Sequence, residues 1–342
     1  MRILLVTQMW PSRENPDLGS FLVPVKRELE ALGHEVEVAA ISRRGGPPTK
    51  YARLSGQAVA AAVRGRPDVV FAHFLFPAGA AGALASLASR APLVVMVHGQ
   101  DVANLARMRG VTPASRAVVR RSSTVIANSR WLAGILAERI PTVSGRTEVI
   151  DCGVDLGAFE PRPAPEARAE LGWEGDGPAF VCVGSLIERK NVVRLADAFE
   201  RLERGRLAFV GDGPLRGSLE GRPNVRVTGR LPQAEVPAWI AASDVLCQPS
   251  HIEPFGQATL EGMAMERSVV ATKVGGPPEF VTPEAGVLVD PGDVDELAAA
   301  LDRAAALPSP NTAARAAASE HDVVRQAARM AAVLERAVER RQ

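Results

Sequence analysis

Short apolar runs recur along the chain and alternate with longer segments in which apolar residues stand three or four positions apart. The first run, Arg2–Gln8, is rich in β-branched residues and has no polar alternation, which is typical of a strand buried on both faces of a parallel sheet. The segment Ser20–Leu32 has apolar residues at helical spacing, and Gly33 stands where a left-handed C-cap belongs. The chain therefore opens with a predicted strand and helix, the repeating unit of an α/β fold.

The same alternation continues as far as Asp155. It predicts further strands at Glu35–Ile41, Asp68–Ala72, Leu93–His98, Thr124–Ala127 and Thr147–Ile150, and helices at Ser55–Arg64, Ala78–Ser89, Ala114–Arg121 and Ser129–Arg139. Parallel strands joined by helices form a doubly wound sheet, so these residues predict one complete Rossmann-like domain.

A segment rich in proline and glycine, Phe159–Gly177, interrupts the pattern and is interpreted as an interdomain connection. A second series follows, with strands predicted at Ala179–Val183, Arg206–Val210, Val225–Thr228, Val245–Gln248, Ser268–Ala271 and Gly286–Val289, and final helices at Asp293–Ala305 and Glu320–Arg341. We predict an α/β protein with tandem Rossmann-like domains at 1–155 and 165–318, and a C-terminal helix at 319–342. Ligands of such sheets bind beyond the carboxyl ends of the strands, so we expect both domains to face a central cleft.

Charge is divided unequally between these two series. The first 155 residues carry 19 Lys and Arg against 12 Asp and Glu, whereas the remainder carries 21 against 27, although the net charge is only +1. A basic first half favours an anionic partner such as a phosphate group or an anionic membrane surface.

The ends and the cysteines of the chain indicate a reducing compartment. The three cysteines show no C-x-x-C spacing and their number is odd, so neither a disulfide framework nor a zinc site is expected. The apolar run at the N-terminus stops at Trp10-Pro11, too early for a signal sequence, and the most apolar window, Phe74–Ser89, is too short for a membrane span. We expect a cytoplasmic protein.

Two glutamates, Glu253 and Glu261, follow the predicted strand that ends at Gln248. Pro254-Phe255-Gly256 forms a turn between Glu253 and a predicted helix, whose N-terminus has unpaired N–H groups suited to holding phosphates. Spacing alone leaves two interpretations equally open, because two surface glutamates beside a helix start would look the same.

The sequence around these glutamates resembles the E-x7-E signature of glycosyltransferase family 4, the group 1 enzymes with the GT-B fold. The resemblance rests on five segments that run over nearly the whole chain: Glu253-Pro-Phe-Gly-Gln-Ala-Thr-Leu-Glu261, Ala271–Glu279 with its Gly-Gly turn, Val149–Asp155 with Phe159, Gly211–Pro214 and Gly229–Pro232. It implies a metal-independent, retaining glycosyltransferase of the hexosyltransferase type, with a nucleotide-diphosphate sugar as co-substrate and no cofactor. It also implies that the final helix crosses back to the first domain.

The resemblance assigns roles to residues of the second domain. Glu253 is expected to meet the donor sugar, Glu261 the ribose, and Lys190 the diphosphate, where a cation stabilises charge that grows in the transition state. Further donor contacts are implied for Arg189, Ser185, Phe255, Gly256 and Leu231. The family commonly has Arg where this chain has Ser185, so Arg189 is the candidate to supply the missing positive charge. For Lys190, an ordinary solvated charge at the start of a helix is an alternative to diphosphate binding that carries equal weight.

In the first domain, His98 and Gly19 match the family pattern. His98 ends a buried strand and is followed by Gly99, and the resemblance places it at the donor sugar as a catalytic residue. Gly19 resembles the loop that approaches the diphosphate, and Asn15–Phe21 is most like the branch that makes teichuronic-acid-type surface polysaccharides. Asp101 is interpreted as a helix cap.

Two motifs are interpreted as decoys. Asp293-Val-Asp295 has the D-x-D form of metal-dependent enzymes of another fold, but its place after Pro291-Gly292 favours an N-cap. Gly211–Gly217 is similar to a dinucleotide fingerprint, but its third glycine does not have the usual spacing and no acidic residue follows at the end of the next strand, which argues against an NAD enzyme.

The partners expected are a nucleotide-sugar donor and a saccharide or lipid-linked acceptor. Arg107, Arg109, Arg116, Arg120 and Arg121 form a basic stretch, which we interpret first as a solvated face and second as a contact with an anionic membrane at the inner face of the cell. No nucleic-acid partner is expected, because no aromatic residues are interleaved there. A nucleotide-sugar epimerase and a non-catalytic sugar-binding protein stay open as alternatives.

Overall fold

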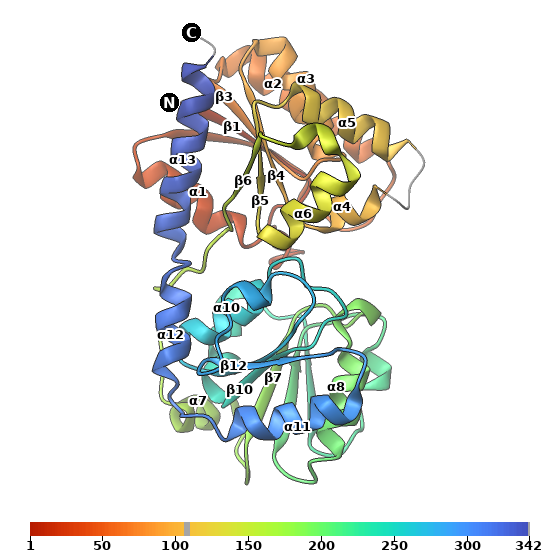
Figure 1. Cartoon of the computed structure of the whole chain (residues 1–342), viewed down its shortest axis with the longest axis vertical. Coiled ribbons are helices and arrows are strands. Elements are labelled where there is room, and N and C mark those ends of the chain that lie inside the picture. The colour runs from red at the N-terminus through yellow and green to blue at the C-terminus, as the bar shows by residue number, and fades with distance from the viewer. Residues whose placement is uncertain (106–109, 341–342) are drawn as a thin grey trace. The chain divides into compact units, whose positions relative to one another are not determined.

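The computed structural model describes residues 1–105 and 110–340 and divides the chain into two compact units. The first unit comprises Met1–Gly153 and the C-terminal segment that begins at Val323, and the second comprises Val154–Asp322. Each unit contains one six-stranded sheet of parallel strands with helices on both faces (Figure 1). The predicted fold class, two doubly wound parallel sheets in tandem, is confirmed.

The first sheet has the strand order β2-β1-β3-β4-β5-β6. Its strands are β1 (Arg2–Thr7), β2 (Glu35–Ala40), β3 (Val69–His73), β4 (Leu93–Val97), β5 (Thr124–Ala127) and β6 (Thr147–Val149). The strand order reverses between β1 and β3, so the loops that follow these two strands diverge at that point.

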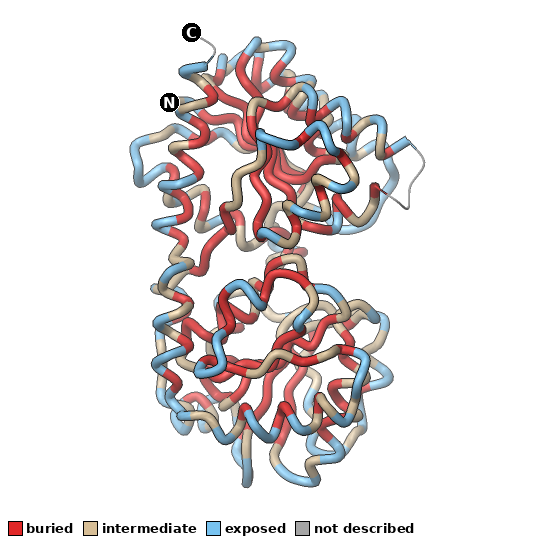
Figure 2. The backbone as a smooth tube through the Cα atoms, in the orientation of Figure 1, coloured by how far each residue is buried: buried red, intermediate tan, exposed pale blue. Residues whose placement is uncertain are grey.

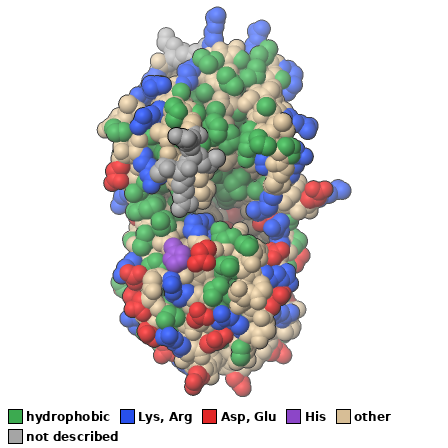
Figure 3. Space-filling view, turned by 90° about the vertical axis from the view of Figure 1, so that its right-hand side faces the viewer, with side chains coloured by type: hydrophobic (Ala, Val, Ile, Leu, Met, Phe, Trp, Pro, Cys, Tyr) green, Lys and Arg blue, Asp and Glu red, His purple; other side chains and the backbone are tan. Residues whose placement is uncertain are grey.

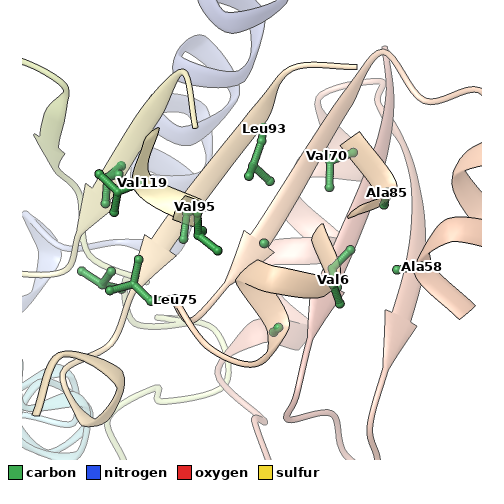
Figure 4. Close-up of a cluster of buried hydrophobic side chains, with 14 of the residues drawn as sticks. Val6, Ala58, Val70, Leu75, Ala85, Leu93, Val95 and Val119 are labelled. Atoms are coloured by element: carbon green, nitrogen blue, oxygen red, sulfur yellow. The ribbon is translucent and has the colours of Figure 1, made fainter. Parts of the chain in front are cut away.

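Helices cover both faces of the first sheet. They are α1 (Leu22–Ala31), α2 (Thr49–Gly65), α3 (Ala78–Ser89), α4 (Gln100–Asn104), α5 (Val111–Arg121), α6 (Arg130–Arg139) and α13 (Val323–Glu339). On one face, α2, α3 and α5 bury small and branched side chains such as Ala58, Ala85 and Val119 against Val70 and Leu93 (Figure 4). The many alanines allow this close approach of helix to sheet.

The other face of the first sheet is covered by α1 and by α13 from the far end of the chain. Met330 and Leu334 of α13 are fully buried in one cluster with Leu5 and Phe71 of the sheet and Leu29 of α1. Arg336 of α13 also forms a bidentate ion pair with a glutamate of β6. The last helix therefore supplies core side chains to the first unit.

The second sheet has the strand order β12-β11-β10-β7-β8-β9. Its strands are β7 (Ala179–Val183), β8 (Arg206–Val210), β9 (Val225–Gly229), β10 (Val245–Gln248), β11 (Ser268–Thr272) and β12 (Gly286–Val289). The order reverses between β7 and β10, which makes the crevice between the loops after these strands the expected ligand position of this sheet. Strands β8, β10 and β11 are buried along their whole length (Figure 2).

Helices again lie on both faces of the second sheet. They are α7 (Ala164–Leu171), α8 (Val192–Glu200), α9 (Val236–Ala242), α10 (Gln257–Ala264), α11 (Val294–Ala305) and α12 (Thr312–Ser319). Along β7, Phe180 and Cys182 face the cluster that contains α8 and α11, whereas Val181 faces the cluster with α9, α10 and α12. This alternation is the two-sided burial that the apolar run predicts.

Three sequence-based boundaries differ from the structure. The segment interpreted as an interdomain connection contains helix α7, whose following Trp173 packs on Trp239 in the core of the second unit. Helix α2 begins at Thr49, earlier than Ser55, because Pro48 takes helical dihedral angles that suit a helix start. The predicted last helix, Glu320–Arg341, is α13 and begins at Val323, and it is preceded by a short helix, α12, that the sequence analysis did not predict.

Within the described residues, we find no helix that combines the length and the apolar character needed to cross a lipid bilayer.

Candidate active site

Lys190 and Glu253 meet at the point where the strand order of the second sheet reverses. Lys190 ends a 3-10 turn in the loop after β7, and Glu253 lies in the loop after β10, 63 positions later. The Lys190 Nζ donates a hydrogen bond of 2.6 Å to Oε2 of Glu253. Lys190 is therefore not a solvated charge, because its ammonium is paired and its side chain is only 16% exposed.

One oxygen of the Glu253 carboxylate is fixed and the other is not. Oε2 also accepts a hydrogen bond of 3.1 Å from Ser250 Oγ and lies 4.0 Å from the Arg189 guanidinium. No described residue donates a hydrogen bond to Oε1. A carboxylate held by one oxygen keeps the other oxygen for a ligand hydroxyl.

Charges around Glu253 decide its ionisation. Burial by itself raises the pKa of this carboxyl, but the Lys190 ammonium, its hydrogen bond, Arg189 and the Ser250 hydroxyl outweigh burial and leave the pKa below its ordinary value. Glu253 is therefore ionised at neutral pH although its residue is 8% exposed.

The backbone of Glu253 is held by the Gly-Gly turn after β11. The Glu253 N–H donates to Val274 O (3.1 Å), and Gly276 N–H donates to Glu253 O (2.9 Å). Gly275 has φ of +123°, and a Cβ there would lie 2.0 Å from Glu253 O. Only glycine fits between these segments, so the turn fixes the position of Glu253.

Arg189 and Ser185 complete the loop after β7. Arg189 donates a hydrogen bond of 3.0 Å to Ile252 O, so both adjacent cations, Arg189 and Lys190, face the loop of Glu253. Ser185 is half-buried beside Gly184. The Gly211–Gly217 segment packs here, because a Cβ on Gly211 would lie 1.9 Å from Gly184 O. Close packing of this kind explains Gly211 and also Gly213, where a Cβ would lie 2.4 Å from Leu186 O.

Glu261 lies on α10, the helix that follows Glu253. Gly256 precedes the helix with φ of +112°, and Phe255 is buried against Phe280. Glu261 is 8% exposed. Burial raises its pKa to about 8, while a hydrogen bond with Gln257 and the charge of Lys190 lower it by less. The two glutamates of the motif therefore differ in charge at neutral pH. Leu231, in the loop after β9, packs on the same core cluster as Phe255.

This buried carboxyl makes the stability of the free protein depend on pH. The folded state keeps the Glu261 proton up to about pH 8, whereas the unfolded chain releases it near 4.5, so this stabilisation is complete below pH 4.5 and is lost as the pH rises through 8. We expect Glu261→Gln to lose less free energy of unfolding than the wild type between these two pH values. Urea unfolding at both pH values measures the difference, and identical pH dependence in the two proteins would contradict it.

His98 of the first unit is paired with a second histidine. His98 Nε2 and His73 Nδ1 are 3.0 Å apart, and the rings of Phe21 and Phe74 lie against His98. Burial lowers the pKa of His98 to about 3 and that of His73 well below its usual value, so both rings are neutral.

The surroundings of His73 favour one arrangement of the two ring protons. His73 Nε2 is buried without a hydrogen-bond partner among the described residues. A buried ring nitrogen without a hydrogen-bond partner costs less free energy as a lone pair than as an N–H group. The proton of His73 is therefore favoured on Nδ1, from which it is donated to His98 Nε2. His98 then carries its own proton on Nδ1, where it can donate to a ligand.

Asp101 and Gly19 shape the loops around His98. The Asp101 carboxylate accepts hydrogen bonds from the N–H groups of Leu75, His98 and Gly99, so it joins the loops after β3 and β4 as well as standing in the first turn of α4. Gly19 has φ of +69°, and a Cβ there would lie 2.5 Å from Met9 O. Both residues therefore have structural reasons for their identity.

Three residues that the sequence analysis did not single out belong to these clusters. His73 ends β3 and contacts His98, while Gln248 and Ser250 lie beside Lys190 and Glu253. The Gln248 amide donates a hydrogen bond of 3.1 Å to Ser250 Oγ, which leaves the single Ser250 hydroxyl proton for Glu253 Oε2. All three stand at or just after strand ends, the positions where ligands of these sheets bind, and that signal was available in the sequence.

The remaining candidates are placed as follows. Asp293 caps α11 by accepting hydrogen bonds from two N–H groups of its first turn, which confirms the capping interpretation of the D-x-D segment. In the described part of the chain, no cluster of three or more His, Cys, Asp or Glu side chains could hold a metal ion.

The basic stretch is described only in part. Arg116 and Arg120 are exposed on α5, whereas Arg107 and Arg109 lie outside the described residues. On the face drawn in Figure 3, Lys and Arg predominate over the first unit, and acidic side chains are more frequent over the second. The charge asymmetry of the sequence is therefore visible on this surface.

Family models match both units of the chain. The model described as Glycosyltransferase Family 4 matches residues 20–158, and the model described as Glycosyl transferases group 1 matches residues 177–306. The protein belongs to glycosyltransferase family 4. The resemblance carried by the motifs is thereby confirmed.

Curated relatives of this family-4 glycosyltransferase cover most of its length. It is 28% identical to the putative teichuronic acid biosynthesis glycosyltransferase TuaC of Bacillus subtilis, over 89% of each chain. It is 33% identical to the D-inositol 3-phosphate glycosyltransferase of Thermobispora bispora, over 78% of this chain and 67% of the relative.

Solved structures match the glycosyltransferase along its whole chain. The sucrose-phosphate synthase from Thermosynechococcus elongatus superposes with a TM-score of 0.80 over 98% of both chains at 20% identity, which bears on the fold alone. Anabaena HepE in complex with UDP superposes with a TM-score of 0.76 at 25% identity, over 98% of this chain and 100% of that one. The GT-B fold implied by the motifs is confirmed.

Proposed function

We propose that this protein is a retaining, metal-independent glycosyltransferase that moves a hexose from a nucleotide-diphosphate sugar to a hydroxyl acceptor. This transfer is a step in the synthesis of a cell-surface polysaccharide or glycolipid. The second unit binds the donor and the first unit binds the acceptor.

The observation that carries the proposal is the Lys190–Glu253 pair at the strand reversal of the second sheet. Oε2 of Glu253 holds Lys190 next to the crevice, where the Lys190 ammonium can neutralise the leaving diphosphate. Oε1 of Glu253 is available for a hydroxyl of the donor sugar. The negative charge of the Glu253 carboxylate stabilises the oxocarbenium-like positive charge that develops at the anomeric carbon. An ionised Glu253 suits this role at neutral pH.

The rest of the donor is bound by neighbouring groups. The N-terminus of α10, after Phe255-Gly256, offers unpaired N–H groups to the diphosphate, and Arg189 adds a second cation. The Glu261 carboxyl accepts hydrogen bonds from the ribose hydroxyls. Ser185 and Leu231 line the donor site. Of the first unit, Gly19 contacts the diphosphate and His98 contacts the sugar.

The transfer balances without a protein base. The bond between the anomeric carbon and the diphosphate oxygen breaks, the electron pair stays with the diphosphate, and the acceptor oxygen bonds to the same face of the sugar. The acceptor proton passes to the departing phosphate oxygen. A neutral His98 with its proton on Nδ1 donates a hydrogen bond to the sugar and does not take up this proton.

Relatives support the donor and acceptor classes. HepE was crystallised with UDP and also with UDP-glucose, which supports a nucleotide sugar as donor. TuaC is named for teichuronic acid biosynthesis and another relative for D-inositol 3-phosphate, which supports a saccharide or lipid-linked acceptor. Work at the inner face of the cell membrane, with Arg116 and Arg120 toward anionic lipid, is part of the proposal.

The test is a screen of UDP-, GDP- and ADP-sugars by thermal shift, followed by turnover with the donor that stabilises. A donor at 100 times its Kd stabilises the folded state by about 2.7 kcal/mol. We expect slow release of the sugar without acceptor, and NMR should show the anomeric configuration of the donor retained in the first product.

Two other results would replace the proposal. Conversion of the nucleotide sugar into its epimer would identify an epimerase. Binding of a sugar without any turnover would identify a binding protein.

A further inference from the structure

A cationic pocket lies at the carboxyl edge of the first sheet, entirely within the first unit. It has a volume of about 420 Å³ and is lined by Ser12, Arg13, Glu14, Ala40, Ile41, Ser42, Arg43, Lys50, Arg53 and Gln57. These residues come from the loop after β1, the end of β2 with its following loop, and the first turns of α2. The pocket contains four cationic side chains and one carboxylate.

The pocket is built by contacts between the two loops. Trp10 N–H donates to Ile41 O (3.0 Å), and Ser12 Oγ donates to Ser42 O (2.9 Å). On α2, Lys50, Arg53 and Gln57 are three and four positions apart, so they share one face of the helix. The wall of the pocket is thus set by a backbone hydrogen bond, a serine hydroxyl and a helix, which gives a ligand a defined position.

Three guanidinium groups around the pocket lack a partner. Arg13, Arg43 and Arg53 form no hydrogen bond or ion pair with any residue that the structure describes. Of the carboxylates nearby, Asp17 already binds Arg44 (2.5 Å) and Glu37 binds Arg64 (2.5 Å), so among the lining residues Glu14 alone offsets part of the charge of the four cations. The excess of positive charge is therefore not compensated by the protein itself.

The donor set of the pocket matches a phosphate ester. Guanidinium groups present paired N–H donors that fit phosphate oxygens, and several cations in one concavity balance a dianion better than a singly charged carboxylate. Four positive charges gathered around a single carboxylate repel one another, so a dianion would relieve that repulsion as well as supply acceptors.

A second cavity adjoins the pocket and fits the rest of such a molecule. It measures about 450 Å³ and shares Ala40, Ser42 and Gln57 with the cationic pocket. Trp10 and alanines of α2 line one part of it, and the paired side chains of Glu37 and Arg64 line another. An aromatic and aliphatic wall beside a cationic pocket suits a molecule that joins a phosphate to a sugar ring or an apolar chain.

We propose that this pocket binds the phosphate group of the acceptor, so that the acceptor is a phosphate ester. The inference rests on the proposed function, because it takes the first unit as the acceptor side. It extends that proposal from any hydroxyl acceptor to one that carries a phosphate remote from the reacting hydroxyl.

Arg43 and Arg44 provide a matched pair for the test. Arg43 lines the pocket without a partner, whereas the adjacent Arg44 is paired with Asp17 and does not line it. We expect wild-type protein to bind glucose 1-phosphate, used as a soluble phosphate ester, in calorimetry with the donor nucleotide present at saturation. Arg43→Gln and Arg53→Gln should each weaken this binding about tenfold, in line with loss of one charge-assisted pair, whereas Arg44→Gln should change it less than about twofold.

A second arm identifies where the phosphate resides. Vesicles that contain phosphatidic acid are sedimented with each variant in parallel with the calorimetry. Loss of vesicle binding by Arg43→Gln and not by Arg44→Gln, without binding of the soluble ester, would assign the phosphate to a lipid. Equal effects of Arg43→Gln and Arg44→Gln in both arms would overturn the proposal.

Failure of this inference is distinct from failure of the proposed function. Donor stabilisation and donor hydrolysis depend on the second unit together with Gly19 and His98, which do not line this pocket, so Arg43→Gln and Arg53→Gln should leave both unchanged. Normal donor hydrolysis with no difference between the Arg variants rejects the phosphate site alone. Absence of any nucleotide-sugar binding rejects the proposed function.

Discussion

Replacing Glu253 by Gln should lower kcat by about 10²- to 10³-fold while nucleotide affinity changes less than about threefold, the size of loss seen when one electrostatic contact to a transition state is removed. Gln keeps the shape of the side chain and an acceptor oxygen for Lys190 and Ser250, so the loop should keep its geometry. It removes the negative charge that we propose stabilises the anomeric carbon in the transition state. Steady-state kinetics of transfer and calorimetry with the nucleotide measure the two quantities.

Glu188→Gln is the matched control for this change. Glu188 stands in the same loop as Lys190, and its side chain is 86% exposed. Removing its charge should leave kcat and nucleotide affinity as in the wild type. If Glu253→Gln turned over donor as fast as Glu188→Gln, the role proposed for Glu253 would be wrong.

Replacing Gly275 by Ala should lower the free energy of unfolding by about 3 kcal/mol or more, because steric overlap adds to a strained backbone conformation. The added Cβ would lie 2.0 Å from Glu253 O, and φ of +123° is disfavoured for any residue with a side chain. The Glu253 loop must move to relieve the overlap, so transfer activity should fall as well. Urea unfolding and transfer kinetics of the same preparation measure both effects.

Gly217→Ala tests whether the loss is specific to that position. A Cβ on Gly217 would meet no atom within 4 Å. Its substitution should change the free energy of unfolding by no more than about 0.5 kcal/mol. Equal stability of the two variants would show that the Gly-Gly turn does not fix the Glu253 backbone.

The two glutamates of the E-x7-E motif differ in ionisation at neutral pH, which suits them to different roles. Lys190 keeps Glu253 charged in the free protein, whereas burial keeps Glu261 protonated up to about pH 8. A protonated carboxyl can still accept one hydrogen bond from a ribose hydroxyl, but the ionised form accepts more. Nucleotide binding that uses the ionised form must therefore release a proton below pH 8.

Much of the fold was predictable from the sequence because burial on both faces leaves a direct mark. The runs Leu93–Val97 and Ala179–Val183 are short, apolar and without alternation, and both are central parallel strands. The interpretation of Phe159–Gly177 as an interdomain connection is wrong, because helix α7 begins directly after Pro163. Proline suits the first turn of a helix, where its missing N–H costs nothing.

The E-x7-E segment was likewise predictable as a strand–turn–helix, because Gly256 and the helical spacing after it are local features. Its partners were not. Lys190 lies 63 positions from Glu253, and His73 lies 25 positions from His98. Hydrophobic periodicity identifies strands but carries no information on their order in the sheet.

Sequence by itself therefore determined the elements, the two sheets and the family pattern around Glu253 and Glu261. Tertiary structure decided that β10 lies beside β7, which brings Glu253 to Lys190 and gives one motif glutamate a charge partner and the other only burial. It also gathered Arg13, Arg43 and Arg53 from three segments around one pocket. The physical reason is that ionisation and ligand binding depend on distances in space, which strand order sets and local pattern does not.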